Sequence, residues 1–217
     1  MELQNVKDDI ASRLKSHRVD LFIKRILDII LSFALFIVLL PLLIIIAIVI
    51  KIDSEGPVIF TQVRVGTNGE KFKIFKFRTM VKDAEKKFDL NIDKNNLGSL
   101  VFQDKGDPRV TKVGAFLRKT SLDELPQLLN VFIGDMSLVG PRPEIPAVAD
   151  YYNDTQRLRL SVRPGITGLA QVSGRGEIQL EKTIEYDLTY IKGFNIWLDI
   201  KILFKTITVV FKREGAY

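Results

Sequence analysis

The apolar run from Ile29 to Ile50 constrains the fold of this chain more than any other stretch. It reads IILSFALFIVLLPLLIIIAIVI, which is 22 residues without a charged side chain. A helix of about 20 apolar residues is long enough to cross the hydrocarbon core of a bilayer. The run is too long for the apolar part of a signal peptide, and no small-residue cleavage site follows it. The sequence therefore predicts a membrane-associated protein.

The residues alone leave two arrangements of this run open. One is a spanning helix kinked at Pro41, because proline removes a helix hydrogen bond. The other is a re-entrant helix–break–helix in which Pro41 turns the chain back, so that both ends share one membrane face. Basic residues flank the run at both ends, Lys24 and Arg25 before it and Lys51 after it. Positive charge concentrates on the cytoplasmic side, which suits the re-entrant arrangement.

The composition limits the chemistry that the chain can perform. There is no cysteine and a single histidine, His17, so disulfides, thiolate metal sites and histidine-based triads are not available within one chain. The formal net charge of +6 favours acidic partners such as anionic headgroups, phosphorylated substrates or nucleic acid. Nucleic acid is not expected as a partner, because the basic residues gather around the membrane run and no nucleic-acid module is recognisable.

After Lys51 the sequence predicts a small, mostly helical domain with a short β-hairpin. Residues 58–77 read as two strands joined at Asn68-Gly69, a type I′ turn signal. Helical spacing of apolar residues is present in 113–132 and 180–192, and 151–160 is also expected to be helical.

Residues 195–212 are amphipathic, with Trp197 and several aliphatic residues on one stripe and lysines on the other. Such a helix either packs on the domain core or lies at the membrane interface, and the preceding membrane run favours the interface. The predicted fold class is thus α+β, a membrane-associated domain with an N-terminal re-entrant segment and interfacial helices. Its expected divisions are a polar segment 1–19, a membrane segment 20–51 and a catalytic domain 52–217.

Two adjacent carboxylates, Asp123 and Glu124, lie in the stretch TSLDELPQLLN. Ser121-Leu-Asp-Glu124 matches a capping box, in which the pair only begins a helix. Pro126 conflicts with a helix that begins at Ser121, because it would remove a ladder hydrogen bond at the fifth helical position. A helix start nearer Asp123, or a break there, fits better.

Arginines in or beside Gly/Pro-rich segments point to a second role for the pair. In such segments the backbone approaches ligands closely, and guanidinium groups bind phosphates in a bidentate manner. An aspartate can attack phosphorus to give an acyl phosphate, a step that needs a hard cation such as Mg²⁺. Together the carboxylates and arginines predict a site for a phosphate ester. The four arginines are Arg118, Arg142, Arg163 and Arg175.

The chain resembles the bacterial sugar transferase family, the polyprenyl-phosphate glycosyl-1-phosphate transferases, over roughly residues 20–213. These enzymes are also called monotopic phosphoglycosyl transferases, and this chain resembles their minimal catalytic unit. The resemblance rests on ordered blocks that include GPVIFTQVRVG, FKIFKFRTM, DPRVTKVGAFLRKTSLDELPQLLNVFIGDMSLVGPRPE and RPGITGLAQVSGR.

The resemblance implies a reaction and a site. Asp123 is expected to attack the β-phosphate of a UDP-sugar, releasing UMP, and polyprenyl (undecaprenyl) phosphate then takes the sugar phosphate from the aspartate. Asp123 and Glu124 are also the expected Mg²⁺ ligands. The arginines expected to bind the phosphates or nucleotide are Arg78, Arg118, Arg142, Arg163 and Arg175.

The resemblance also implies a membrane segment that is re-entrant and broken at Pro41. The family lies in one leaflet of the bacterial inner membrane, at its cytoplasmic face. Leu40 stands here where family members often carry serine before the proline. The sugar, the glycan pathway and a possible homo-oligomeric state are left open.

Two other functions compete with the transferase. A non-catalytic anchored scaffold or regulator of envelope polysaccharide assembly would use the carboxylate pair only as a helix cap. A membrane phosphatase with the same aspartyl chemistry would release inorganic phosphate rather than UMP.

Overall fold

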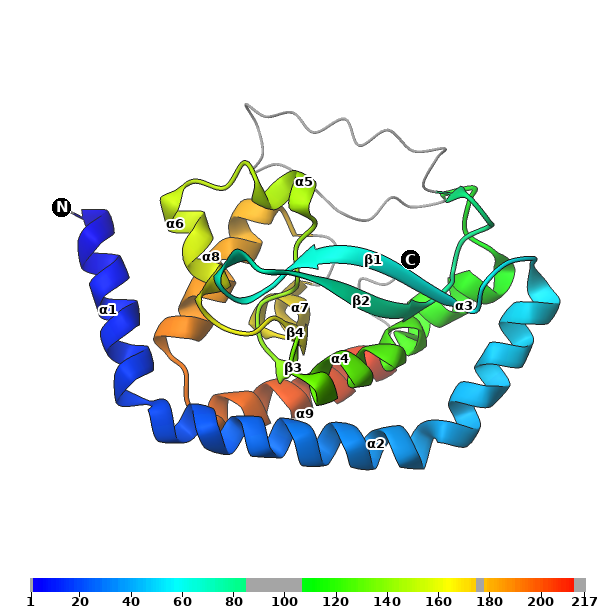
Figure 1. Cartoon of the computed structure of the whole chain (residues 1–217), viewed down its shortest axis with the longest axis horizontal. Helices are drawn as coiled ribbons and strands as arrows, with labels where there is room; N and C mark the ends of the chain where they lie inside the picture. The colour runs from blue at the N-terminus through cyan, green and yellow to red at the C-terminus, as the bar shows by residue number, and fades with distance from the viewer. Residues whose placement is uncertain (1, 85–106, 175–177, 213–217) are drawn as a thin grey trace.

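The computed structural model describes residues 2–84, 107–174 and 178–212. Helix α1 (Glu2–Ser16) precedes α2 (Arg18–Asp53), a 36-residue helix with Pro41 inside it. The ribbon of α2 bends between its N-terminal and C-terminal parts, as Figure 1 shows. The expected helix–break–helix is therefore a bend within one continuous helix. A bend is the usual result of a proline inside a helix, because only a local part of the hydrogen-bond ladder is lost.

The predicted hairpin is confirmed. Strands β1 (Ile59–Val65) and β2 (Lys71–Phe77) pair antiparallel, with Val65 opposite Lys71. The turn is a short 3₁₀ segment, η1 (Thr67–Gly69), in which Asn68 and Gly69 have φ values of 56° and 85°. The Glu70 N–H donates to the Thr67 carbonyl at 3.1 Å, as the type I′ signal predicts.

The predicted helical segment 113–132 forms three separate pieces. Helix α3 (Lys112–Thr120) ends at Ser121, which has φ 57°, and a 3₁₀ helix η4 (Leu122–Gln127) leads into α4 (Leu128–Ile133). The left-handed residue ends the first helix, and Pro126 lies inside the tighter 3₁₀ turn. The break near Asp123 that the proline predicts is present.

The expected helix at 151–160 is shorter and divided. Its place is taken by α6 (Asp154–Arg157) and the 3₁₀ helix η5 (Leu158–Ser161), and α5 (Pro146–Ala149) lies upstream. Asn153 caps α6 through a complete capping box with Gln156, which explains why the helix begins there and not at Tyr151.

A second small sheet was not predicted from the sequence. Strands β3 (Ser137–Val139) and β4 (Gly165–Thr167) are parallel, with Ser137 opposite Gly165. The two chain segments approach so closely that a Cβ on Gly165 would lie 2.1 Å from the Gly140 nitrogen. A glycine is required at this position because any larger residue would force the strands apart.

Two C-terminal helices are present as predicted, α8 (Leu180–Lys192) and α9 (Ile196–Lys212). A short helix before them, α7 (Leu169–Gly174), was not predicted from the sequence. The main core lies between these helices, the hairpin and α4. Its fully buried members include Ile74, Val131, Met136, Ile191 and Ile202. This core fixes the hairpin and α4 relative to each other, and the carboxylate pair lies where they meet.

One side of the molecule exposes apolar side chains. Figure 1 shows α2 along this side with α4 and α9 beside it. In the described ranges, α2 is the one helix that is long and apolar enough to cross a membrane. Further exposed apolar side chains come from α4 and α9: Leu129, Phe132, Ile133, Trp197, Phe204, Ile207 and Phe211. So many exposed apolar side chains on neighbouring helices indicate contact with a membrane or a partner.

Two buried polar contacts join the N-terminal half of α2 to the rest of the domain. Lys24 Nζ lies 2.6 Å from Asp199 Oδ2 of α9, and both side chains are largely buried. Asp28 accepts a hydrogen bond from the Leu138 N–H at 3.0 Å. Asp28 thus binds the backbone of β3.

Candidate active site

Asp123 and Glu124 lie in the 3₁₀ turn between α3 and α4, and both are largely buried. Asp123 is 9% exposed, and the Glu124 side chain is 19% exposed. The capping box is not formed, because Ser121 makes no side-chain cap hydrogen bond and serves as the left-handed C-cap of α3. Glu124 points instead to cationic side chains, so the pair has a different role from the start of a helix.

Two cations bind the Glu124 carboxylate. Lys76 Nζ of β2 lies 2.9 Å from Oε1, and Arg142 of the loop after β3 donates to the same oxygen at 3.3 Å. The Lys76 side chain is 15% exposed and that of Arg142 is 41% exposed. Partial burial strengthens these attractions, because less water screens them.

The two carboxyls have opposite shifts in pKa. Burial raises the pKa of Asp123 to about 6, with the neighbouring Glu124 charge adding to the rise and Lys76 opposing it. At Glu124 burial also acts to raise the pKa, but Lys76 and Arg142 outweigh it and lower the pKa to about 2. Adjacent carboxyls with pKa values pushed apart are typical of sites where the two groups have different roles.

Sequence reasoning missed Lys76, although the strand pattern carries a signal for it. Alternation along β2 places Lys76 on the same face as Phe72 and Ile74, and Ile74 is 2% exposed. A lysine on a buried face needs an anionic partner. Asn130 of α4 holds the strand in place, since its side chain accepts from the Phe75 N–H at 3.0 Å and donates to the Lys73 carbonyl at 2.7 Å.

Arg118 approaches the pair from α3, and its expected role as a phosphate ligand stays a prediction. Its Nε donates to Thr79 Oγ1 at 2.9 Å, and its charge acts to lower the pKa of Asp123. Gly114 makes this position possible, because a Cβ there would lie 2.0 Å from the Thr79 carbonyl oxygen. The helix therefore packs directly on the chain after β2, and its last turn brings Arg118 beside Asp123.

A small cavity opens beside Glu124. Its lining includes Lys76, Arg142 and two residues that sequence reasoning missed, Arg64 and Gln127. Gln127 is 2% exposed, and its side-chain nitrogen has no hydrogen-bond partner within the described part of the chain. A buried donor without a partner is costly, so this nitrogen is suited to meet an oxygen of a bound ligand.

Two other predicted arginines, Arg78 and Arg163, bind backbone carbonyls. Arg78 is 7% exposed and donates to the carbonyls of Ser54 at 2.7 Å and Ile50 at 3.3 Å. It therefore binds the C-terminal end of α2, where free carbonyls attract a cation. Arg163 donates to the Gly134 carbonyl at 3.0 Å, at the end of α4. The geometry does not support either as a phosphate ligand of this site, and Arg175 lies outside the described residues.

The carboxylate pair suits a metal that arrives with a phosphorylated ligand. Within the described ranges no group of three or more His, Asp or Glu could hold a metal by itself. Mg²⁺ is commonly bound by one or two carboxylates together with substrate phosphates. Glu124 is already paired with Lys76 and Arg142, so a bare cation would be repelled unless phosphate oxygens drew those side chains away. The residues fit Mg²⁺ on this condition.

The fold and the site together define a class of protein. Its members have an apolar face suited to contact a membrane and a buried carboxylate pair surrounded by cationic side chains. The chain belongs to the bacterial sugar transferase family, whose model matches residues 19–213. The match includes all of α2 except its first residue and nearly all of the chain that follows it.

Several curated proteins are similar to the chain. It is 47% identical over 92% of its length to UDP-glucose:undecaprenyl-phosphate glucose-1-phosphate transferase of Klebsiella pneumoniae, of which it covers 42%. It is 52% identical over 74% of its length to galactosyl transferase CpsE of Streptococcus agalactiae serotype III, covering 36% of that protein. Exopolysaccharide production protein ExoY of Rhizobium meliloti is 38% identical over 89% of the chain, which covers 88% of ExoY. The chain thus spans less than half of the first two relatives.

Proposed function

We propose that this protein transfers a sugar 1-phosphate from a UDP-sugar to polyprenyl phosphate, such as undecaprenyl phosphate, and releases UMP. This would be the first membrane step in building a surface glycan. The observation that carries the proposal is the buried Asp123–Glu124 pair with Lys76, Arg118 and Arg142 around it. The names of similar proteins, among them an undecaprenyl-phosphate galactose phosphotransferase of Salmonella typhimurium, support the same reaction.

The reaction proceeds through a covalent aspartyl intermediate. A carboxylate oxygen of Asp123 attacks the β-phosphorus, and the bond from that phosphorus to the bridging oxygen breaks. UMP leaves with the bridging oxygen, and the sugar phosphate remains on Asp123. A phosphate oxygen of the lipid then attacks the same phosphorus and displaces Asp123, which regains its carboxylate. Each step exchanges one phosphorus–oxygen bond for another, so no oxidant is needed.

The cations around the pair serve the phosphates. Lys76 and Arg142 hold Glu124 in the free protein and turn toward the diphosphate when it arrives, since phosphate carries more charge than one carboxylate. Asp123 and Glu124 would hold Mg²⁺ together with phosphate oxygens, and the bound ion would supply positive charge beside the phosphate. Arg118 stays beside Asp123 and favours its ionised, attacking form. Gln127 donates its free amide hydrogen to a ligand oxygen.

The apolar face supports a position of this site at the surface of one membrane leaflet. Both ends of α2 are attached to the same domain: Lys24 binds Asp199, and the carbonyls of Ile50 and Ser54 bind Arg78. A straight span would carry one of these ends across the bilayer and away from the domain. The attachments support a re-entrant α2 bent near Pro41, with the domain on the cytoplasmic face, where basic flanks are preferred.

UMP release tests the proposed function. Purified protein is incubated with a set of UDP-sugars, undecaprenyl phosphate and Mg²⁺, and UMP and inorganic phosphate are both measured. The expected result is UMP release over many turnovers that depends on the lipid, with at most about one UMP per protein molecule when the lipid is left out. Release of inorganic phosphate without UMP supports a phosphatase instead. A folded protein that releases neither with any sugar supports a scaffold, in which the carboxylate pair has no chemical role.

A further inference from the structure

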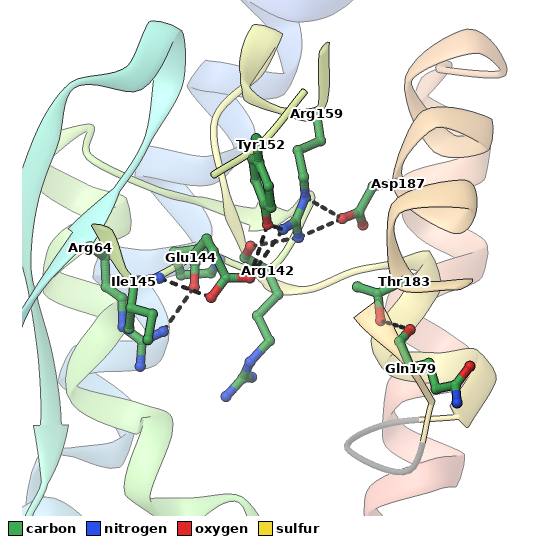
Figure 2. A network of polar contacts seen from close by, with 10 residues as sticks. Arg64, Arg142, Glu144, Ile145, Tyr152, Arg159, Gln179, Thr183 and Asp187 are labelled. Carbon is green, nitrogen blue, oxygen red and sulfur yellow. Dashed lines mark hydrogen bonds and ion pairs between the residues drawn. The ribbon is translucent and has the colours of Figure 1, made fainter. Parts of the chain in front are cut away.

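Four buried polar residues form one network behind the loop that carries Arg142. Arg159 of η5 is 1% exposed, and its Nε donates to Asp187 Oδ2 of α8 at 2.8 Å. Its Nη1 reaches Glu144 Oε2 at 3.3 Å and also bonds the Tyr152 hydroxyl. Tyr152 donates to Glu144 Oε2 at 3.1 Å. Figure 2 shows that the four side chains converge from different elements.

This network is connected to Arg142 through the backbone. The third guanidinium nitrogen of Arg159, Nη2, lies 2.6 Å from Asp187 Oδ2 and also donates to the Arg142 carbonyl at 3.0 Å. The Arg142 side chain extends away from the network (Figure 2) and ends at Glu124. Arg159 thus holds the main chain of the residue whose side chain meets the carboxylate pair.

The loop is held at two further points. Glu144 Oε1 accepts from the Ile145 N–H at 2.9 Å, and the Glu144 carbonyl accepts from the Val65 N–H of β1 at 2.8 Å. Arg64 Nη1 donates to the Pro143 carbonyl at 3.2 Å. These bonds attach the loop to the hairpin that also supplies Lys76.

We propose that Glu144, Tyr152, Arg159 and Asp187 position Arg142 for the substrate phosphates without touching the substrate themselves. The proposal rests on the proposed function for the identity of the ligand. A buried ion network contributes little net stability, because desolvation offsets much of its attraction. What it does supply is a fixed geometry, and a displacement of about 1 Å at a reacting group can cost about 100-fold in rate.

The test uses Tyr152→Phe and Arg159→Lys. Phe keeps the ring and loses the hydroxyl, whereas Lys keeps the charge and loses the forked donor set. Ile184→Val is the matched control. Ile184 is 5% exposed and lies in the apolar cluster that includes Tyr152, and its replacement by valine removes no polar contact. If Arg159→Lys does not fold, Tyr152→Phe still decides the question.

Three measurements are made on each purified variant: KM for the UDP-sugar in UMP release, affinity for UDP by calorimetry, and deuterium uptake of peptides covering 140–147. Both network variants are expected to raise KM and weaken UDP binding about 10-fold or more, to change kcat less, and to increase deuterium uptake in the loop. Ile184→Val should match the wild type in all three. Unchanged uptake, KM and UDP affinity in folded network variants would overturn the proposal.

A double-mutant cycle separates positioning from a general loss of stability. If Arg159 acts through Arg142, Arg142→Ala with Arg159→Lys binds UDP no more weakly than Arg142→Ala alone. If the loss of UDP affinity in the double variant equals the product of the losses in the two single variants, the proposal is contradicted. If the wild type releases no UMP and binds no UDP, the proposed function fails, but deuterium uptake still shows whether the network holds the loop.

Discussion

Lys76 and Glu124 are 48 residues apart in the sequence and form an ion pair with 2.9 Å between Nζ and Oε1. The pair joins the hairpin to the turn that carries Asp123. It keeps Glu124 ionised, since Lys76 is the largest of the influences that lower the pKa of that carboxyl. The neighbouring Asp123 forms no ion pair with the residues that the structure describes, and burial raises its pKa although Lys76 acts to lower it. The difference between the two carboxyls therefore depends on Lys76.

Replacing Lys76 with methionine should weaken both activity and stability. Glu124 has a lowered pKa in the folded state, so its stabilising contribution is present above its unfolded pKa and is lost as pH falls through about 2. Without Lys76 that loss begins at higher pH, and the free energy of unfolding at pH 7 should fall by up to about 3 kcal/mol. Denaturant unfolding between pH 3 and 8 measures this change. Lys71→Met, at an exposed position of the same strand, is the control and should show neither effect.

The pH dependence of UMP release should follow Asp123. Burial raises the pKa of this carboxyl to about 6, and only the ionised form attacks phosphorus. The value of kcat/KM should therefore decrease as pH falls through about 6, approaching tenfold per pH unit below it. An Arg118→Gln variant removes a nearby positive charge and should shift the decrease to higher pH. A profile that stays flat from pH 5 to 8 in the wild type contradicts the role of Asp123.

Lysine replacements should lower kcat/KM at an arginine near the Asp123–Glu124 pair and leave it unchanged at an arginine elsewhere. Arg142→Lys should lower kcat/KM about 10- to 100-fold, because lysine cannot bind phosphate in a bidentate manner. Arg163→Lys should stay near the wild-type rate, since Arg163 binds the Gly134 carbonyl. Steady-state UMP release measures both variants. Equal losses in the two would mean that Arg163 also serves the substrate.

Arg78→Lys is predicted to act on stability. The guanidinium of Arg78 binds several carbonyls at the C-terminal end of α2, and lysine can replace only part of that pattern. The thermal midpoint should decrease while KM for the UDP-sugar stays unchanged. A raised KM for the UDP-sugar with an unchanged thermal midpoint would mean that Arg78 binds the substrate phosphates.

Local patterns in the sequence predicted the elements whose signals lie within a few residues. The Asn68-Gly69 turn, the strands beside it and the amphipathic helix α9 were all predicted in this way. The division of 151–160 was not predicted, although the capping box between Asn153 and Gln156 is also a local signal. The β3–β4 pair depends on contacts between distant segments, which no local pattern carries.

The site was predicted only in part for the same reason. The carboxylate pair and Arg142 stand out in the sequence because turn residues surround them. Lys76 reaches Glu124 across the hairpin, and Arg159 reaches the Arg142 carbonyl from η5. The sequence also placed Arg78 near the phosphates, but its burial against the end of α2 could be seen only in three dimensions.

The two ends of α2 should lie on the same side of the membrane. The test uses two single-cysteine variants, Ser12→Cys and Glu70→Cys. Both positions are exposed, and the chain has no cysteine of its own. In cells, both should resist a membrane-impermeant thiol reagent added from the periplasmic side and should react after the inner membrane is opened. Labelling of Ser12→Cys from the periplasm, with Glu70→Cys protected, would establish a spanning helix.

The central claim is that Asp123 forms a covalent bond to the sugar phosphate. The Asp123→Asn variant should fold, because burial raises the pKa of Asp123. A raised pKa means that this carboxyl favours the folded state below its unfolded pKa and loses that contribution as pH rises through about 6. At pH 7 the neutral asparagine should therefore cost no stability. Asp123→Asn should nevertheless lose UMP release by several orders of magnitude, as expected for a missing nucleophile.

Trapping the intermediate is the most direct measurement. Wild-type protein is incubated with Mg²⁺ and UDP-sugar labelled in the sugar, without lipid acceptor, and the denatured protein is analysed by mass spectrometry. The account predicts a hydroxylamine-sensitive sugar phosphate on Asp123, absent in Asp123→Asn and removed when polyprenyl phosphate is added. UMP release and sugar transfer at the wild-type rate by folded Asp123→Asn, with no label on the wild-type protein, would contradict it.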